Sequence, residues 1–441
     1  MYIDKVKVGQ NIRKIRKAKD MTLKELSSNI CSITKLSNIE NGIGEISLDD
    51  LEKFCIKLNI SIQDLLPKSE KFFLDQSRVA FAKIEDFIRM GFHDIAESKI
   101  EKLVDDEMLL PLQINYLKAL NNYEIRNYHS AMYFLFEMIK EKHSIELEKE
   151  LISKAFNLIG IIYNKLGDYS SAQEMFEKAI NSSTNKQWTN LVLYNLVVVF
   201  ATKGQVIDAR FKIGEIISSH FPYQQKIRYI STILDVLEGD YNQSIEKIFE
   251  LRNEFFQLKE FDSFLRTIIF FIYIYDKHPK IFNNYLIEVE SFILDMSEIK
   301  RIPENTNPIL VANLLQTMTL HFLKQKDLKK ADQYLKLAFD LAEKHPNESM
   351  NAITYYLAAI IHNQSESDKE TQLVYLKKAL KQIEFGQPSV LKGLILYELA
   401  KIEEIKDSYW KQAADNFFDS MLINNYFNHI NLSMLMPQML Y

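Results

Sequence analysis

The sequence predicts an all-α fold in two parts, a small helical module at the N-terminus and a long array of paired helices after it. The 441 residues include only 11 Gly and 9 Pro, too few for the many tight turns of a β-rich chain. Hydrophobic residues at 47% and charged residues at 26% are ordinary for a soluble globular protein. A pattern of small and aromatic residues also recurs at intervals of about 35 residues, which is typical of stacked helix pairs.

Charge is distributed unevenly between the two parts. Residues 1–67 hold 11 basic and 9 acidic side chains, a net charge of +2, whereas the remainder holds 43 and 50, a net charge of −7. Five of the basic residues lie within seven positions: Arg13, Lys14, Arg16, Lys17 and Lys19. A basic face on a small domain is typical of phosphate binding, although a solvated helix face would look the same.

The first 67 residues predict five short helices. The apolar spacing of Val8, Ile12 and Ile15 predicts a helix over 6–19. Thr22 and Glu25 have the spacing of a capping box, so a second helix begins at Thr22 and ends near residue 30. A third helix is expected over 33–40, a fourth after residue 47, and a fifth over 61–66.

This segment resembles the phage-repressor (Cro/cI, XRE) helix-turn-helix over residues 6–66. The marks of the resemblance are Leu26, the Ile39-Glu40-Asn41-Gly42 helix ending and the closing Asp64-Leu65-Leu66. In this motif the second helix of the pair enters the major groove by its N-terminal residues, while the first crosses the DNA backbone. The third helix of this chain is therefore the expected recognition helix.

The motif assigns roles to individual side chains. Lys35 and Asn38 are expected to read guanine and adenine, and Ile33 or Thr34 to meet a thymine methyl group. Leu36 and Ile39, on the opposite face, are expected in the core. Phosphate contacts are expected from four residues: Arg13, Lys14, Lys17 and Thr22. The resemblance implies that Arg16 pairs with Glu40 as a structural salt bridge rather than with DNA.

The recognition helix departs from the common family pattern, which often carries Arg or Gln at the base-reading positions. Ile33, Thr34, Lys35 and Asn38 stand there instead. The operator sequence is therefore not predicted, and a role in protein binding stays open. One such module reads only a few base pairs, so we expect double-stranded DNA with a palindromic operator and a homodimer, with a tetramer as the other possibility.

Helical repeats follow the N-terminal module. Phe156, Gly160, Tyr163, Ala172 and Phe176 match the tetratricopeptide (TPR) pattern in type and spacing. The small residue of each second helix recurs at separations of 35, 41, 37 and 35, at Ala96, Ala131, Ala172, Ala209 and Ser244. Gly-containing segments near 91, 167, 204 and 239 fall at the turns between paired helices.

The repeat pattern continues weakly to the end of the chain. It resumes near Lys326, weakens after Asp368, and leaves room for one more helix pair over 255–300. We predict about nine repeats in a right-handed TPR superhelical solenoid with a C-terminal capping helix after Asn424. The predicted organisation is a helix-turn-helix domain over 1–67, a linker over 68–76, and a repeat domain over 77–441 for peptide binding and oligomerisation.

The first helices of the repeats are expected to line a concave groove that binds a peptide. Asn suits an extended peptide because its amide satisfies both a backbone N–H and a C=O, and Tyr offers an apolar wall with a polar tip. The candidate ligand-binding residues are Tyr116, Tyr123, Asn157, Asn164, Tyr194, Lys226, Tyr229, Asn313 and Gln316. The alternative for each of them is packing between repeats, because the register can slip by one residue.

A helix-turn-helix joined to a TPR solenoid resembles the architecture of the Rap–Rgg–NprR–PlcR–PrgX (RRNPP) family of quorum-sensing regulators. The resemblance implies a cytoplasmic receptor for a short imported signalling peptide that changes oligomer geometry and hence operator affinity. Two alternatives stay open. One is a DNA-tethered TPR adaptor that recruits a protein without a peptide ligand, and the other is a regulator that also acts on a phosphorelay protein.

Other functional classes have no support in the sequence. The chain shows no P-loop, HExxH or GxSxG motif and no paired Cys and His, so we expect no enzyme activity and no cofactor. Cys31 and Cys55 lack the spacing of a metal site, so no metal is expected. The polar N-terminus is not a secretory signal, and the apolar run 268–275 is too short to span a bilayer. We therefore expect a cytoplasmic protein without a membrane partner.

Overall fold

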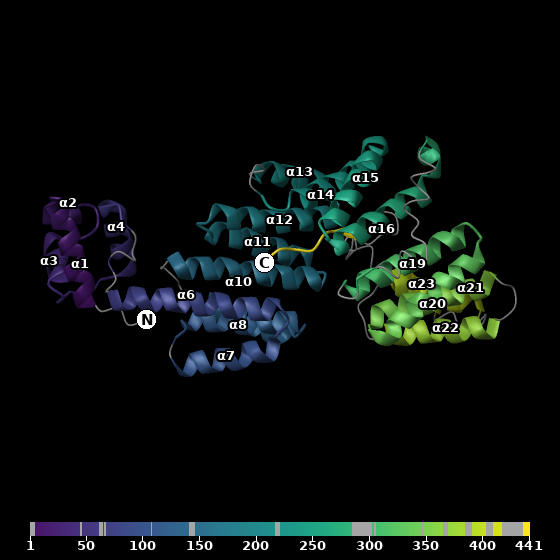
Figure 1. Ribbon diagram of the computed structural model, residues 1–441, viewed down its shortest axis with the longest axis horizontal. Helices are drawn as coiled ribbons and strands as arrows, with labels where there is room; N and C mark the ends of the chain where they lie inside the picture. Colours follow the sequence, from purple (N-terminus) through teal and green to yellow (C-terminus); the bar gives the residue numbers. More distant parts are fainter. Residues whose placement is uncertain are drawn as a thin grey trace. The chain divides into compact units, whose positions relative to one another are not determined.

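The structure is a computed structural model that consists of helices joined by turns (Figure 1). It describes residues 5–441 except 45, 61–64, 66–67, 107, 141–145, 217–220, 285–301, 304–305, 346, 365–368, 384–389, 403–408 and 417–434. No β-strand occurs among these residues, so the predicted all-α class is confirmed. The predicted helix 61–66, apart from Leu65, and residues 425–434 of the predicted capping helix lie outside the described residues, whereas residues 436–441 are described and are not helical.

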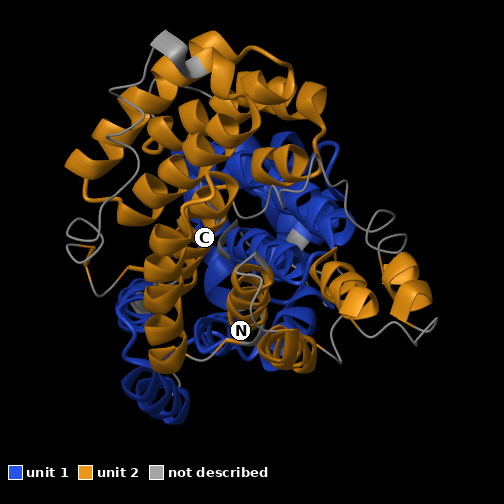
Figure 2. Cartoon of the chain, turned by 90° about the vertical axis from the view of Figure 1, so that its right-hand side faces the viewer, with its two compact units in different colours: residues 1–196, 440–441 blue, residues 197–439 orange. Residues whose placement is uncertain are grey.

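The chain divides into two compact units, which Figure 2 distinguishes by colour. Unit 1 comprises residues 1–196 together with 440–441, and unit 2 comprises residues 197–439. The boundary falls inside α12 (Lys186–Thr202). Unit 1 thus contains the N-terminal module, the first repeats, and two residues from the far end of the sequence.

The N-terminal module of unit 1 contains four described helices: α1 (Lys5–Ala18), α2 (Leu23–Ser27), α3 (Ile33–Glu40) and α4 (Leu48–Leu58). They enclose one apolar core in which Leu36 and Ile39 are buried, as predicted. The second helix is shorter than the predicted 22–30, because Asn29 adopts φ 63°, outside the right-handed helical region.

Helix pairs make up the rest of unit 1. The pairs are α6 (Lys68–Arg89) with α7 (His93–Asp105), α8 (Pro111–Glu124) with α9 (Tyr128–Ile139), and α10 (Glu146–Lys165) with α11 (Tyr169–Ser182). Residues 68–76, predicted as a linker, lie inside α6. Their sequence contains no Gly or Pro that would interrupt a helix, so the repeat array begins directly after residue 67.

The small residues that fixed the predicted repeat register are completely buried. The fully inaccessible positions are Ala96, Ala131, Ala172, Ala209 and Ser244. Each lies on the second helix of its pair, where a larger side chain would separate the two helices. The predicted positions of the small residues on the second helices are therefore confirmed from α7 to α15.

The turn between paired helices has a recurring backbone conformation. Gly91, Gly167, Gly204 and Gly239 all have positive φ angles between 69° and 90°. After Gly167, for example, the Asp168 N–H donates to the Tyr163 carbonyl at 2.9 Å, and such a bond closes the helix end in a Schellman-type motif. The glycines predicted as turn residues occupy left-handed positions that other residues adopt only at a cost.

Gly160 allows α10 and α11 to approach closely. A Cβ atom there would lie 2.7 Å from the ring of Phe176, which is itself fully buried. We expect Gly160→Ala to lower the free energy of unfolding by about 1–3 kcal/mol, because the extra methyl group overpacks this contact. Urea denaturation measures the effect. Gly214→Ala in α13 is the matched control, since nothing lies within 4 Å of that Cβ, and it should be neutral or stabilising.

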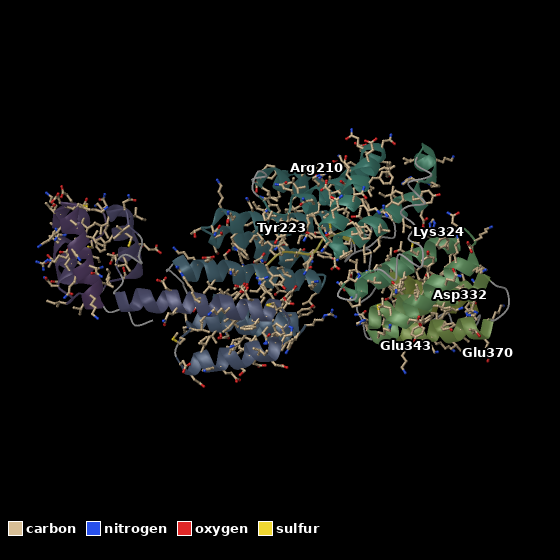
Figure 3. The ribbon with its side chains drawn as sticks, in the orientation of Figure 1. Arg210, Tyr223, Lys324, Asp332, Glu343 and Glu370 are labelled. Atoms are coloured by element: carbon tan, nitrogen blue, oxygen red, sulfur yellow. The ribbon has the colours of Figure 1, made fainter. Side chains whose placement is uncertain are left out.

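Unit 2 continues the array after α12. Its helices are α13 (Val206–Glu215), α14 (Gln224–Leu237), α15 (Tyr241–Gln257), α16 (Phe261–Lys277), the 3₁₀ turn η2 (Pro279–Asn284), α19 (Pro308–Lys324), α20 (Leu328–Lys344), α21 (Glu348–Gln364), α22 (Lys369–Gln382) and α23 (Val390–Ile402). An ion pair between Arg210, labelled in Figure 3, and Asp235 joins α13 to α14 at 2.6 Å. Glu343 of α20 and Glu370 of α22, also labelled there, are exposed charged side chains.

Candidate nucleic-acid interface and peptide groove

Helix α2 and helix α3 each begin with a side-chain cap. The Thr22 hydroxyl accepts from the Glu25 N–H at 3.1 Å, and the Glu25 carboxylate accepts from the Thr22 N–H at 2.7 Å. This is the predicted capping box. Ser32 caps α3 in the same way, by accepting from the Lys35 N–H at 3.1 Å. The two caps fix where the pair of helices begins.

One face of α3 is exposed to solvent and carries both polar and apolar side chains. Ile33, Thr34, Lys35 and Asn38 are all exposed, and Ile33 keeps 46% of its surface accessible although it is apolar. These four side chains have no role in the core, which the opposite face of α3 supplies. A short helix with an exposed N-terminal face has the dimensions to enter a DNA major groove.

Arg16 and Glu40 form a buried bidentate ion pair between α1 and α3. Arg16 donates from Nε to Glu40 Oε1 at 2.6 Å and from Nη2 to Oε2 at 2.8 Å. A third bond runs from Arg16 Nη1 to the carbonyl of Met21 at 2.7 Å. The hydrogen bond that Arg16 donates to Glu40 is the main cause that raises the pKa of Arg16. Arg16 is therefore occupied inside the protein and is not on the surface of α1.

Lys35 is paired with Asp50 across the module. Lys35 Nζ lies 2.6 Å from Asp50 Oδ2, and the Asp50 side chain is only 8% exposed. Burial raises the pKa of Asp50, but the bonds from Lys35 and Ser47 outweigh it, so the net pKa lies below its usual value. The Lys35 ammonium must leave this carboxylate before it can contact a base. The sequence did not predict this competing partner.

The predicted phosphate-binding residues of α1, Arg13, Lys14 and Lys17, lie on its exposed face. Arg13 donates from Nη1 to Asn41 Oδ1 at 3.2 Å, and Lys14 and Lys17 are exposed. Neither lysine has an ion pair among the residues that the structure describes. These side chains, together with Thr22 at the start of α2, stay predicted phosphate contacts.

Gly9 is a residue of the module that the sequence analysis did not single out. A Cβ atom at this position would lie 1.9 Å from the carbonyl oxygen of Ile39. Only glycine therefore allows α1 to approach the last turn of α3. The available signal was an isolated glycine within a helical pattern, which often marks close packing.

The repeats of unit 1 bring two asparagines of adjacent first helices together. Asn195 of α12 donates from Nδ2 to Asn157 Oδ1 at 2.8 Å, and both residues are fully buried. Both contact the backbone of Leu440: its carbonyl accepts from Asn195 at 2.6 Å and from Asn157 at 3.1 Å. Tyr123 of α8 lies close by, with its ring centroid 5.4 Å from that of Tyr441. Asn157 and Tyr123 are thus predicted groove residues that do share a site.

Three other predicted groove residues of unit 1 have different surroundings. Tyr194 is completely buried, and its neighbour Asn195 makes the contact with Asn157. The predicted register of α12 is therefore displaced by one residue. Tyr116 is 1% exposed and packs on Phe81 at 5.9 Å between ring centroids. The buried Oδ1 atom of Asn164 has no hydrogen-bond partner.

The predicted groove residues of unit 2 contact helices of their own and of neighbouring repeats. Tyr229 is fully buried, and its ring meets Phe255 and Phe270 edge-on. Gln316 donates from Nε2 to the Met350 carbonyl at 3.0 Å and so joins α19 to α21. Lys226 and Asn313 are less buried than Tyr229 and Gln316.

Of these two, Lys226 lies 3.5 Å from the Glu260 carboxylate, and the backbone carbonyl of Asn313 accepts from Thr317 at 2.7 Å. Tyr229 and Gln316 therefore pack between helices, which was the alternative expected for each candidate.

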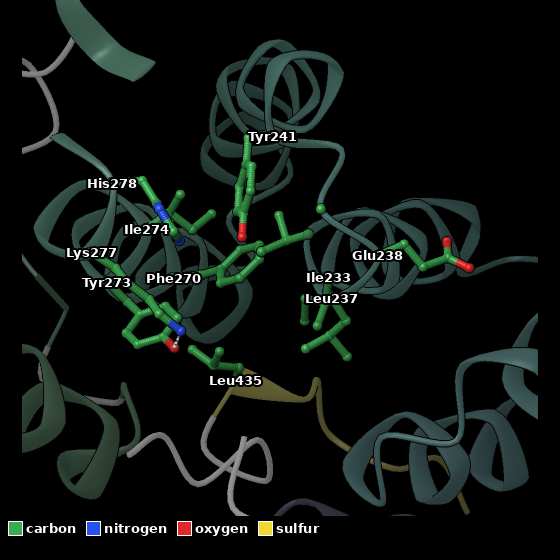
Figure 4. A pocket seen from close by; sticks show the side chains of 12 residues that line it. Ile233, Leu237, Glu238, Tyr241, Phe270, Tyr273, Ile274, Lys277, His278 and Leu435 are labelled. Atoms are coloured by element: carbon green, nitrogen blue, oxygen red, sulfur yellow. Dashed lines mark hydrogen bonds between the residues drawn. The ribbon is translucent and has the colours of Figure 1, made fainter. Parts of the chain in front are cut away.

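Unit 2 also contains a small apolar pocket of about 170 Å³ between α14, α15 and α16. Figure 4 shows Ile233, Leu237, Phe270 and Tyr241 around it. Leu435, which comes from the C-terminal segment 435–441, also lines this pocket and is 1% exposed. Nothing in the sequence analysis pointed to it.

Comparison with known families identifies the N-terminal module. Residues 12–65 match the family described as Helix-turn-helix (HTH_3). This module is a helix-turn-helix domain. Its α2 and α3 are the paired helices of the motif, and α3 is the helix in the recognition position.

Solved structures resemble between 58% and 79% of the chain at low sequence identity. The Rap protein complexed with Competence and Sporulation Factor is 12% identical, covers 79% of this chain and 97% of its own, and gives a TM-score of 0.51. PlcR from Bacillus thuringiensis, in complex with the peptide PapR7 and DNA, is 18% identical with coverages of 58% and 96% and a TM-score of 0.37. The SHP pheromone receptor Rgg2 from Streptococcus dysgalactiae is 15% identical, with coverages of 62% and 98% and a TM-score of 0.35.

At these identities the likeness concerns the fold alone. The chain shares its helical fold with the Rap protein, in agreement with the predicted all-α fold class. No curated protein sequence matches the chain. Within the described part of the chain, no helix is long and apolar enough to cross a membrane. The same residues contain no group of His, Cys, Asp and Glu side chains arranged to hold a metal ion.

Proposed function

We propose that the chain is a sequence-specific transcription regulator whose DNA affinity depends on a short signalling peptide bound in the groove of its repeats. The exposed N-terminal half of α3 carries the first part of the proposal. Within a helix-turn-helix domain, this is the surface that meets base edges. Lys35 and Asn38 are the proposed base readers, and Arg13, Lys14, Lys17 and Thr22 the proposed phosphate contacts.

The paired asparagines of unit 1 support the second part of the proposal. Asn157 and Asn195 contact main-chain atoms of Leu440 rather than its side chain, which is how a groove holds an extended peptide. The Rap structure of similar fold holds Competence and Sporulation Factor. A repeat array of this kind suits a ligand that lies along several helices.

A physical connection runs from these repeats to the DNA-binding domain within unit 1. Lys149 of α10 forms an ion pair with Glu52 of α4 at 2.9 Å, and Leu110 packs against the core of the helix-turn-helix domain. A ligand that shifts α10 would act on α4 through this contact. We propose a homodimer, or a tetramer, on a palindromic operator, so that small changes in subunit geometry alter half-site spacing.

Peptide binding is tested by calorimetry on the purified full chain. Short peptides retained by the immobilised protein from culture medium are sequenced, synthesised and titrated. We expect a dissociation constant at or below the micromolar range, with a change in affinity for operator DNA when the peptide is added. Capture of proteins but no short peptide would favour the DNA-tethered adaptor instead.

A further inference from the structure

The last two residues of the described chain occupy the groove of unit 1. Both backbone polar atoms of Leu440 are bonded to Asn195: the Leu440 N–H donates to Asn195 Oδ1 at 2.8 Å, and the Leu440 carbonyl accepts from Nδ2 at 2.6 Å. Asn157 donates a second bond to the same carbonyl at 3.1 Å. Such two-point pairing imitates a neighbouring β-strand and does not depend on the side chain of the occupant.

The amides of Asn157 and Asn195 need this occupant. Both asparagines are fully buried, and the bond that they share leaves the second N–H of Asn195, both N–H groups of Asn157 and the Oδ1 of Asn195; Leu440 pairs with one N–H of each amide and with that Oδ1. Buried polar groups without partners are costly, so an empty groove must either admit water or rearrange. The two asparagines are therefore built to hold a main chain.

A second set of contacts holds the side chain that follows. The Tyr441 ring meets Tyr123 edge-on with centroids 5.4 Å apart, and the Arg89 guanidinium carbon lies 4.7 Å from the centroid of the same ring. The Tyr441 hydroxyl donates to the carboxylate of Glu124. Burial raises the pKa of Glu124, so this carboxylate gains from a hydroxyl donor that replaces lost water.

We infer that Leu440 and Tyr441 are a tethered occupant of the peptide groove, which an incoming peptide must displace. We define the tyrosine subsite as Arg89, Tyr123 and Glu124. It favours an aromatic side chain with a hydroxyl group, directly after the residue whose backbone Asn195 holds. The inference deepens the proposed function and rests on it only for the claim that the competing ligand is a signalling peptide.

Tethering makes weak contacts sufficient. A segment of the same chain acts at an effective concentration of about 1 mM, the order found for flexible connections. If the free segment bound with a dissociation constant of about 100 μM, the population of chains with an occupied groove would exceed the population with an open groove by about tenfold. An external peptide would then bind about tenfold more weakly than to an open groove, because only the open fraction is competent.

The test measures how a fluorescent peptide copy of residues 436–441 binds to the full-length chain and to a variant that lacks Leu440 and Tyr441. The variant leaves every helix intact, so it should fold as the parent does. We expect fluorescence anisotropy to show at least tenfold tighter binding of the probe to the shortened chain. A probe with Phe in place of its Tyr should bind several-fold more weakly, because it cannot donate to Glu124.

Two further variants locate the site on the shortened chain. Asn195→Ala should abolish probe binding. Asn242→Ala is the control: it removes an exposed asparagine side chain from α15 and should leave probe binding unchanged. Equal binding of the probe to the full-length and shortened chains, or no binding to either, would overturn the inference. Full binding by the Asn195→Ala variant would do the same.

These outcomes are separate from those of the proposed function. If the shortened chain binds the probe tightly but no external peptide is ever captured, the tethered occupant stands and peptide signalling fails. If an external peptide binds the full-length and shortened chains equally, signalling stands and the tethered occupant fails.

Discussion

Arg16→Ala is expected to lower the free energy of unfolding of the helix-turn-helix domain by about 3–5 kcal/mol. The side chains of Arg16 and Glu40 are 9% and 4% exposed, so removing the guanidinium leaves a buried carboxylate without its partner. The Met21 carbonyl also loses a donor. Thermal unfolding monitored by circular dichroism measures the loss of stability. Operator binding should weaken as well, because α3 is no longer held against α1.

The control for this prediction removes the charge without isolating a partner. The double variant Arg16→Met with Glu40→Leu should be far more stable than Arg16→Ala, since replacing both members of a buried ion pair by apolar groups is often neutral. Arg13→Ala, on the exposed face of the same helix, should leave stability nearly unchanged. A stable Arg16→Ala variant with weakened DNA binding would instead assign Arg16 to the DNA surface.

Lys35→Ala is expected to weaken operator binding by about 5- to 100-fold and to relax base preference at one position of each half-site. Lys35 lies on the exposed N-terminal part of α3 and has the length to reach a base edge. Arg13→Ala should weaken binding to every duplex alike and reduce the salt slope by about 1, because a phosphate contact carries no sequence information. Fluorescence anisotropy at several salt concentrations, with operator and scrambled duplexes, separates the two effects.

Asp50→Asn changes the other partner of the Lys35–Asp50 ion pair and is expected to strengthen DNA binding instead of weakening it. It removes the carboxylate that holds Lys35 Nζ at 2.6 Å but keeps a side chain of the same size. The freed ammonium should bind DNA more tightly, by up to about fivefold given the modest strength of partly exposed ion pairs. If Lys35→Ala left both affinity and base preference intact, α3 would meet DNA in a different register from the one proposed.

Local sequence was sufficient where the interaction is local. Thr22 and Glu25 of the capping box are three positions apart, and the buried Ala172 follows a pattern that repeats with the helix pairs. Apolar periodicity also assigned Leu36 and Ile39 to the core. Such features depend on helix geometry alone, which a sequence displays directly.

Contacts between distant residues were not predictable in this way. Lys35 and Asp50 are 15 positions apart, and only the tertiary packing of the N-terminal module brings them together. Asn195 was missed because a helical register uncertain by one residue favoured Tyr194. The bond from Asn157 to Leu440 spans 283 positions, and no local pattern indicates it. Residues 68–76, predicted as a linker, are helical instead, and their sequence contains no Gly or Pro to interrupt a helix.

The central claim, that α3 binds DNA sequence-specifically, is tested most directly by selection of DNA sequences. The purified full-length chain is used to select bound duplexes from a random-sequence library, in parallel with the Lys35→Ala variant. We predict enrichment of an inverted repeat whose half-sites lie about one helical turn apart or a multiple of it, with altered preference for the variant. The same weak enrichment of all sequences by both proteins would contradict the account, because α3 would then not read bases.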